Sequence, residues 1–309
     1  MAYNLKIESA KPERFVGGHR LCAGCGAGVA VRGVLRALNE EDRSCCAVAT
    51  SCLEVSSFLY PFTAWQESFM HSAFENAAAS ISGAEAAYTA LKRKGRMNES
   101  YKFIAFGGDG GTYDIGLQSL SGALERGHDM VYVCYDNEAY MNTGIQRSSS
   151  SPKFAEVSTA PVGSVLAGKQ QRKKDLTEII VAHNVPYAAQ TTFIKNFKDL
   201  HEKAHRAIYT EGPAFLNVLA PCPRGWRYDP ADLMTICNLA VETCVWPLYE
   251  VIEGQWKLSY EPKNKLPIED YLRPQGRFRH MFEPGAEWMI EDVQNAIDKK
   301  WEALLKKCN

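Results

Sequence analysis

A glycine-rich tetrad, Gly108-Asp109-Gly110-Gly111, combines residue types that could bind a phosphate through a metal ion. Its glycines let a ligand approach the backbone and expose N–H groups in a concave turn. A helix that begins after such a turn adds the positive end of its dipole. Asp109 would repel a phosphate unless a divalent cation lies between them, and Mg²⁺ prefers such mixed sets of protein and phosphate oxygens. Taken alone, the tetrad is equally typical of a tight turn.

A second oxygen donor is expected at the end of the neighbouring strand. Asn137 follows an apolar run and lies 27 positions after Gly110 (137 − 110), enough for the helix and return strand of a β–α–β unit. Its amide oxygen can coordinate a cation without adding charge, and the backbone carbonyl of Ala139 is a third candidate. The sequence therefore predicts a cation held by Asp109, Asn137 and Ala139.

Four of the ten cysteines form a candidate metal site. The chain shows no export signal, which favours metal binding or redox chemistry over disulfides. Cys22 and Cys25 make a C-x₂-C pair whose small neighbours allow backbone N–H groups to face sulfur. Cys52 and Cys222 each follow an apolar run and complete a set of four. Four thiolates suit a [4Fe–4S] cluster or a structural zinc ion, and the single C-x₂-C pair favours the cluster.

Alternating strands and helices must position these residues. Apolar runs predict strands at 45–50, 101–108, 130–137, 185–193 and 213–222, and segments with helical spacing lie between them. Strand, crossover helix and strand in this order predict a doubly wound, mostly parallel α/β sheet. Ligands of such sheets bind at the carboxyl ends of the strands, where the tetrad, Asn137 and Cys222 all fall.

The strand–helix pattern weakens from Trp226 onward. Residues 261–285 carry Pro, Gly and charges without clear periodicity, and we expect them to form an extended arm on a partner. Residues 286–307 have the spacing of an amphipathic helix. We therefore expect an α/β domain over residues 1–225 and a C-terminal extension over 226–309 that packs on this domain and on partner subunits.

Composition excludes several classes of protein. Of the 309 residues 46% are hydrophobic, so a sizeable core can form, and the formal net charge of −1 gives no attraction to nucleic acid or anionic membranes. No run of about 18 apolar residues predicts a membrane span, and the charged first 15 residues do not resemble a signal peptide. We expect a cytoplasmic protein that binds neither nucleic acid nor membrane.

The order of these motifs resembles one enzyme family. Gly-Asp-Gly followed at this spacing by Asn resembles the thiamine diphosphate fingerprint. The series CAGCG, SCLEV, GDGG, DNEAYMNTGIQRS and APCPRGW resembles the β subunits of 2-oxoacid:ferredoxin oxidoreductases over roughly residues 17–250. YPFTAW, HSAFENAAA and PVGSVLAGK are similar to the pyruvate branch, which includes oxalate-oxidising members. The resemblance implies a sheet of the thiamine-diphosphate-binding type.

The resemblance also implies a role for each matching residue. Mg²⁺ and thiamine diphosphate would bind at Asp109, Asn137 and the Ala139 carbonyl, and a [4Fe–4S] cluster at the four cysteines. Asn142 matches the family's polar residue beside the reacting ring and is the implied catalytic residue. The full set of implied cofactor contacts is Gly108, Asp109, Gly110, Gly111, Asn137, Ala139, Asn142, Thr143, Ser51 and Glu54. Ser51 departs from the family, which often has Gly there, and the Ser run at 148–151 is longer than usual.

The implied reaction is the oxidative decarboxylation of a 2-oxoacid, with pyruvate favoured. Electrons would pass one at a time to the cluster and on to ferredoxin, and coenzyme A would collect the acyl group. In the family, the Glu that activates the cofactor's pyrimidine belongs to an α subunit. The chain also has no CxxCxxCxxxCP run of its own. We therefore expect activity only with an α subunit, a γ subunit and a ferredoxin-like δ subunit.

Three other interpretations remain open from the residues. The substrate could be oxalate or an aromatic 2-oxoacid. The chain could belong to a non-redox thiamine diphosphate enzyme with a structural zinc ion. It could also be a non-catalytic four-cysteine metal-binding protein whose GDGG is only a turn. A brown anaerobic preparation would support the redox enzyme, and a colourless protein with stoichiometric zinc would contradict it. Thiamine content distinguishes the non-redox enzyme from the non-catalytic metal-binding protein.

Overall fold

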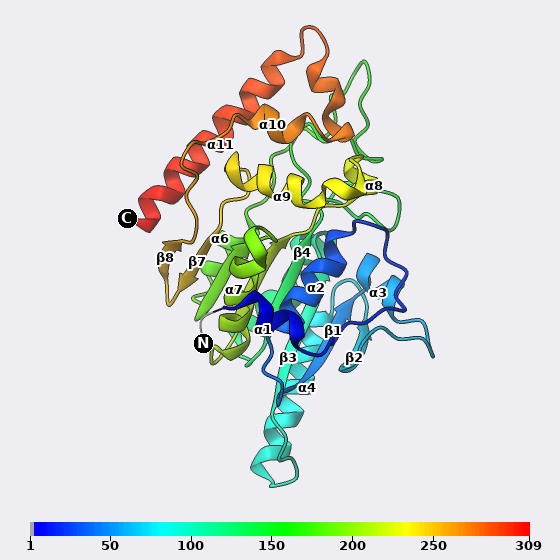
Figure 1. The fold of residues 1–309 in the computed structure, drawn as a ribbon, viewed down its shortest axis with the longest axis vertical. Helices are drawn as coiled ribbons and strands as arrows, with labels where there is room; N and C mark the ends of the chain where they lie inside the picture. The colour runs from blue at the N-terminus through cyan, green and yellow to red at the C-terminus, as the bar shows by residue number, and fades with distance from the viewer. Residues whose placement is uncertain (1–2) are drawn as a thin grey trace.

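One sheet of eight strands, in the order β2-β1-β3-β4-β6-β5-β7-β8, organises the computed structural model, which describes residues 3–309 (Figure 1). The strands are β1 (Arg43–Ala49), β2 (Ser68–Ser72), β3 (Tyr101–Gly108), β4 (Val131–Asp136), β5 (Tyr187–Thr191), β6 (Ala214–Leu219), β7 (Tyr249–Ile252) and β8 (Gln255–Leu258). The first six pair in parallel, whereas β7 and β8 add an antiparallel edge beside β5. The predicted mostly parallel α/β sheet is therefore confirmed.

The central strands are buried on both faces. Every residue of β4 and β6 is buried, as expected for continuous apolar runs in a parallel sheet. Phe106 of β3 pairs with Val48 of β1 on one side and with Val133 of β4 on the other. This register brings the carboxyl ends of β1, β3 and β4 to the same edge of the sheet.

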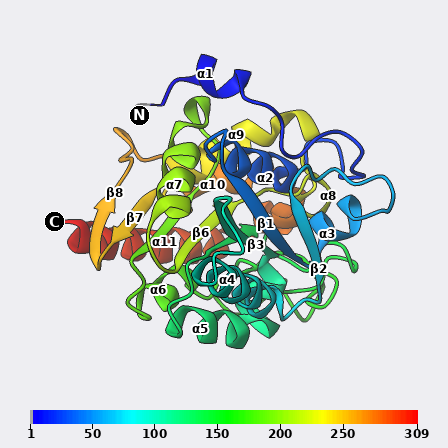
Figure 2. The same ribbon diagram turned by 90° about the horizontal axis from the view of Figure 1, so that it is seen from below.

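Helices cover the two faces of the sheet, as Figure 2 shows. One layer contains α2 (Gly26–Arg36) and α7 (Lys198–Tyr209), and the other contains α4 (Ala77–Arg93), α5 (Leu117–Glu125) and α6 (Leu176–Val181). Helix α2 is amphipathic, and its apolar residues at helical spacing, including Ala30, Val31 and Val34, are buried against the sheet. Each layer thus covers one of the two largest hydrophobic clusters of the described residues.

Short helices begin where three strands end. Helix α3 (Cys52–Ser57) follows β1, the π-helix η1 (Gly110–Ile115) follows β3, and α8 (Pro223–Trp226) follows β6. In η1 the Gly116 N–H donates to the Gly111 carbonyl at 2.6 Å, the wider hydrogen-bond spacing of a π-helix. Such π-turns are frequent at functional sites.

The C-terminal part joins the same sheet through β7 and β8. The segment expected as an extended arm contains α10 (Ile268–Leu272) and the 3₁₀-helix η4 (Gly276–Phe282), whose apolar residues are buried within this chain. The expected final helix is α11 (Glu287–Cys308). The remaining helices are α1 (Leu5–Ala10), η2 (Lys195–Phe197), η3 (Pro230–Asp232) and α9 (Leu233–Glu242). No helix within residues 3–309 has the length and hydropathy needed to cross a membrane.

Candidate functional site

A cavity of about 110 Å³ lies at the carboxyl ends of β1, β3 and β4. Its lining contains every residue predicted to contact thiamine diphosphate or its cation except Glu54. The lining residues are Thr50, Ser51, Cys52, Phe74, Gly108, Asp109, Gly110, Gly111, Tyr135, Asn137, Ala139, Tyr140, Met141, Asn142 and Thr143. A larger, more open cavity between α1 and α7 is lined largely by charged side chains and contains none of the predicted residues.

Two positions of the tetrad, Gly110 and Gly111, have no room for a side chain. A Cβ atom on Gly110 would lie 2.4 Å from a ring carbon of Tyr140, and one on Gly111 would lie 2.8 Å from the Phe74 carbonyl oxygen. The Tyr140 hydroxyl also donates to the Gly110 carbonyl at 2.8 Å. Tyr140 and Phe74 also line the cavity, so a side chain at either glycine would collide with the cavity wall.

The three predicted cation ligands meet at one point. One outer atom of the Asn137 amide lies 2.8 Å from Asp109 Oδ1 and 2.9 Å from the Ala139 carbonyl oxygen. If this atom is nitrogen, it donates to both oxygens. If it is oxygen, three oxygens converge, which is the arrangement that a hard cation requires. The Asn137 backbone N–H also donates to Asp109 Oδ1 at 3.3 Å.

Asp109 lacks enough positive charge around it. Only 1% of this residue is exposed. Burial, together with the nearby Asp136 carboxylate, raises the pKa of Asp109 well above its usual value, despite a hydrogen bond from the Ser148 hydroxyl. A divalent cation would supply the missing charge and stabilise the ionised carboxylate.

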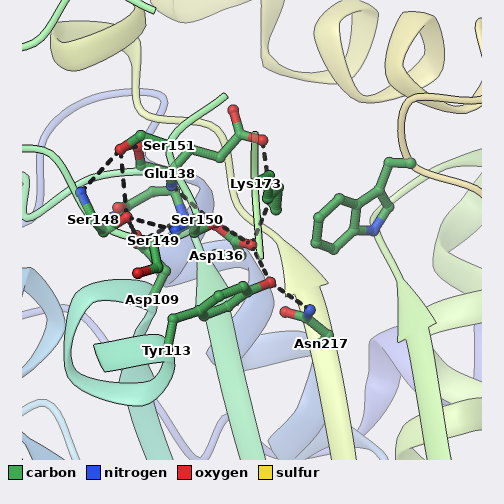
Figure 3. Close-up of polar contacts among 12 residues, drawn as sticks. Asp109, Tyr113, Asp136, Glu138, Ser148, Ser149, Ser150, Ser151, Lys173 and Asn217 are labelled. Carbon is green, nitrogen blue, oxygen red and sulfur yellow. Dashed lines mark hydrogen bonds and ion pairs between the residues drawn. The ribbon is translucent and has the colours of Figure 1, made fainter. Parts of the chain in front are cut away.

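A buried polar network lies directly behind Asp109, and sequence reasoning missed it (Figure 3). Asp136 ends β4 and accepts hydrogen bonds from Ser150 at 2.6 and 2.7 Å and from the Tyr113 hydroxyl at 2.8 Å. Lys173 Nζ lies 2.8 Å from Asp136 and 3.0 Å from Glu138. Burial alone would lower the pKa of Lys173, but these two carboxylates raise it above its usual value. The Ser run at 148–151 was the one visible signal of this network.

The four predicted cysteines lie within electrostatic range of one another. Burial raises the pKa of Cys25 to about 11, and Cys222 and Cys22 add to this shift. Burial raises the pKa of Cys52 to about 12, and the other three thiols add to that shift. Burial likewise raises the pKa of Cys222. Within residues 3–309, however, no three His, Cys, Asp or Glu side chains gather into a site for a single metal ion.

Glycines and backbone N–H groups shape the thiol site. Gly24 has a φ of 68°, and a Cβ atom there would lie 2.5 Å from the Pro230 carbonyl oxygen. The Gly225 N–H donates to Cys222 Sγ at 3.4 Å. Hydrogen bonds from the backbone of Gly28 and Ala27 favour the thiolate of Cys25, although burial outweighs them. Such N–H donors stabilise thiolates and bound clusters.

The thiol site and the cavity are next to each other. Cys52 belongs to the thiol group and also lines the cavity. Met141 lines the cavity as well, and its sulfur would lie 2.2 Å from a Cβ atom placed on Gly225. A redox centre on the cysteines would therefore lie against whatever occupies the cavity.

Comparison with known proteins decides the family. Residues 45–218 match the family described as thiamine pyrophosphate enzyme, C-terminal TPP binding domain. The chain is 50% identical over 294 residues to the pyruvate synthase subunit PorB of Thermotoga maritima, covering 93% of this chain and 90% of that protein. The chain belongs to the 2-oxoacid:ferredoxin oxidoreductase β-subunit family. It is also 41% identical over 296 residues to the ketoisovalerate oxidoreductase subunit VorB of Pyrococcus furiosus, covering 95% of this chain and 93% of that one.

The fold of this β subunit is also found in a solved structure. A 2-oxoglutarate:ferredoxin oxidoreductase from Magnetococcus marinus, with 2-oxoglutarate, coenzyme A and succinyl-CoA bound, superimposes with a TM-score of 0.57 at 22% identity. The match covers 74% of this chain and 78% of that chain. This likeness agrees with the predicted thiamine-diphosphate-binding type of sheet.

The remaining predicted residues of the β subunit take different positions. Glu54 is 1% exposed, lies outside the cavity lining, and has its Oε1 2.5 Å from His71 Nδ1. Asn142 and Thr143 line the cavity at its exposed side. Ser51 also lines the cavity, and its hydroxyl donates to the Ala49 carbonyl at 2.6 Å.

Proposed function

We propose that this chain is the β subunit of a pyruvate:ferredoxin oxidoreductase, in which it binds Mg²⁺, the diphosphate of thiamine diphosphate and one [4Fe–4S] cluster. The observation that carries this proposal is the shared cavity. Asp109, Asn137 and Ala139 converge in its wall, and Cys52 of the thiol group lines the same wall. A cofactor that releases electrons and a centre that accepts them would thus be neighbours.

The chain's own groups have separate tasks in this proposal. Asp109, the Asn137 amide and the Ala139 carbonyl hold the cation, and the glycine tetrad accommodates the diphosphate against the start of η1. Asn142, at the exposed side of the cavity, is positioned to hydrogen-bond the substrate end. Thiamine diphosphate, when bound, supplies the capacity to decarboxylate a 2-oxoacid.

The surroundings of the four cysteines suit a [4Fe–4S] cluster. Cys52 is electrostatically coupled to the other three cysteines. The backbone N–H donors around Cys25 and Cys222 suit the sulfurs of a cluster. A structural zinc ion on the same cysteines is the alternative that metal analysis tests.

The size of the cavity supports the need for partner subunits. About 110 Å³ is well below the roughly 300–1,000 Å³ of complete small-molecule sites. We infer that an α subunit supplies the pyrimidine side, the activating Glu and much of the substrate pocket. A γ subunit and a ferredoxin-like δ subunit complete the complex, coenzyme A is its co-substrate, and ferredoxin receives the electrons.

Pyruvate is the favoured substrate because the 50%-identical relative is named a pyruvate synthase subunit. The 41%-identical relative makes a branched-chain 2-oxoacid the second candidate. The test is to purify the native complex without oxygen, measure iron, sulfide, zinc and thiamine, and follow viologen reduction with pyruvate, ketoisovalerate, oxalate and an aromatic 2-oxoacid. We expect a brown complex that is fastest with pyruvate. A colourless complex with stoichiometric zinc contradicts the redox proposal, and equal rates with several acids contradict the choice of pyruvate.

A further inference from the structure

Trp226 connects the thiol site to the predicted cation loop. It is fully buried, and its indole Nε1–H donates to the Asn137 backbone carbonyl at 2.7 Å. Its own backbone N–H donates to the Cys222 carbonyl at 2.9 Å. One turn of helix, α8, therefore joins a proposed cluster ligand to the backbone of a proposed cation ligand.

Arg277 contacts both Trp226 and Glu138, the residue that follows Asn137. Its guanidinium carbon lies 3.8 Å from the centre of the Trp226 ring, in cation–π contact. The same guanidinium lies 2.6 Å from Glu138 Oε2, and both side chains are 2% exposed. Gln275 Oε1 accepts from Arg277 Nε at 2.9 Å and fixes the plane of the group. Arg277 thus packs on the tryptophan and binds the residue that lies between Asn137 and Ala139.

The loop that this connection holds is strained. Glu138 has a φ of 66°, a left-handed conformation that persists for a non-glycine residue only when its surroundings enforce it. This turn brings the Ala139 carbonyl next to the Asn137 amide, which in turn contacts Asp109. Contacts on either side of Glu138 therefore decide whether the cation ligands converge.

Helix α8 cannot hold its position alone. It has four residues, far fewer than an isolated helix needs. Cys222 is its N-cap, and Cys222 Sγ accepts from the Gly225 N–H inside the turn. Anchoring this sulfur to a cluster would therefore order the turn that carries Trp226.

We propose that Trp226 and Arg277 are positioning residues that couple the two sites, so that a cluster on Cys222 strengthens binding of Mg²⁺ and thiamine diphosphate, and the reverse. This inference rests on the proposed function. Because binding free energies are linked, each site must favour the other by the same factor. Neither residue touches the cavity, so their effect on binding passes through Asn137, Glu138 and Cys222.

Direct shielding is the competing explanation for any link between the sites. Cys52 lines the cavity, so bound thiamine diphosphate could protect a cluster simply by covering it. Shielding does not need the Trp226 hydrogen bond, whereas the coupling does. The variant Trp226→Phe keeps a ring against Arg277 and removes only the donor to Asn137. Trp246→Phe is the matched control, because Trp246 is 2% exposed and its Nε1–H donates to the Thr191 carbonyl at 2.8 Å.

The experiment measures two quantities on the native complex under anaerobic conditions. The first is the affinity for thiamine diphosphate with Mg²⁺, before and after iron is removed with a chelator. The second is the rate of iron loss to the chelator, with the thiamine site empty or saturated. In the wild type we expect removal of iron to weaken thiamine diphosphate binding about tenfold, the size of one buried hydrogen bond. We expect saturation with cofactor to slow iron loss by a similar factor.

The variants separate the explanations. In Trp226→Phe, thiamine diphosphate should bind about tenfold more weakly even with iron present, and saturation should no longer slow iron loss. Trp246→Phe should behave as the wild type does. If saturation with thiamine diphosphate slows iron loss from Trp226→Phe as much as from the wild type, the coupling is wrong and shielding explains the protection. The coupling is also wrong if the wild type binds thiamine diphosphate equally well with and without iron. A complex that contains no iron or no thiamine site overturns the proposed function instead.

Discussion

At the residue scale, the site combines buried carboxylates with fewer buried cations. Asp109 is a carboxylate in a place that disfavours ionisation, because it is buried and faces Asp136. Lys173 and Arg277 form ion pairs with Asp136 and Glu138, and the attraction of Lys173 for Asp109 does not offset the burial of that carboxylate. The buried negative charge of Asp109 therefore attracts a cation, and the same charge destabilises the fold when no cation is bound.

Replacing Asp109 by Asn should weaken cofactor binding without lowering the stability of the cofactor-free complex. We expect Asp109→Asn to weaken thiamine diphosphate binding with Mg²⁺ by at least about 100-fold, because a charged ligand is lost. The cofactor-free complex should unfold at the same or a higher denaturant concentration, since a poorly compensated buried charge is removed. Asp42→Asn, at a buried carboxylate bonded to Tyr209, is the control and should bind normally. Unchanged affinity in Asp109→Asn would remove Asp109 from the cation site.

The glycine tetrad allows a steric prediction. Gly110→Ala should lose most thiamine diphosphate binding, because its Cβ atom would overlap the Tyr140 ring and displace this part of the cavity wall. Gly83→Ala, inside α4 with open space around the new Cβ atom, should bind normally and gain about 1 kcal/mol of stability. Equilibrium binding and denaturant unfolding measure both effects. Normal binding by Gly110→Ala would show that the tetrad does not cradle the diphosphate.

At the element scale, the loop after β4 and the Ser turn at 148–151 support each other. Ser148 donates to Asp109, Ser150 donates to Asp136, and Ser151 donates to the Glu138 carbonyl at 2.6 Å. Lys169 Nζ in turn donates to the carbonyls of Ser151 and Ser149. The Ser turn at 148–151 thus fixes the positions of Asp109 and of the loop after β4 through hydrogen bonds.

Lys169, which binds the Ser turn, should make the free energy of unfolding depend on pH in the alkaline range. Burial, with help from Arg147 and Lys173, lowers the pKa of Lys169 from 10.5 to about 8. Between these values the unfolded chain binds more protons than the native one, so stability rises with pH through this window. The free energy of unfolding of the wild type should therefore increase relative to Lys169→Met from pH 8 to 10.5. Lys94→Met, on the surface, controls for the lost charge, and a constant difference would contradict the shift.

At the scale of the whole molecule, the C-terminal part is continuous with the α/β core. Strand β7 pairs with β5, and Arg277 reaches back to Glu138. Helix α11 buries Met289 and Leu304, and Lys153 and Arg172 both pair with Asp292. The division at residue 225, with partner subunits packed on the extension, stays a prediction.

Truncation tests how far the α/β part depends on this extension. A chain that ends at residue 225 would expose the edge of β5 and leave Glu138 without Arg277. We expect it to aggregate and to bind no thiamine diphosphate. A chain that ends at residue 286 keeps β7, β8 and Arg277, and should retain more native structure by circular dichroism. A soluble 1–225 fragment that binds the cofactor would show that the α/β part is self-sufficient.

Much of the fold and the ligand set could be predicted from local sequence. The strands β3, β4 and β6 are continuous apolar runs, a pattern that only a strand buried on both faces explains well. Asp109, Asn137 and Ala139 follow strand ends, so their meeting at one edge was predictable from the parallel order alone. The segment at 261–285 was harder, because its helical turns are too short to show periodicity.

The sequence by itself determined the alternation of strands and helices, the glycine tetrad and the candidate cysteines, because each is visible as a local pattern of residue types. Only the tertiary structure decided how those groups are held. The Trp226 bond to Asn137 spans 89 positions, and the Arg277 pair with Glu138 spans 139. No local periodicity specifies such pairs. They arise because packing the sheet, α8 and η4 together buries charges and N–H groups that must then find partners.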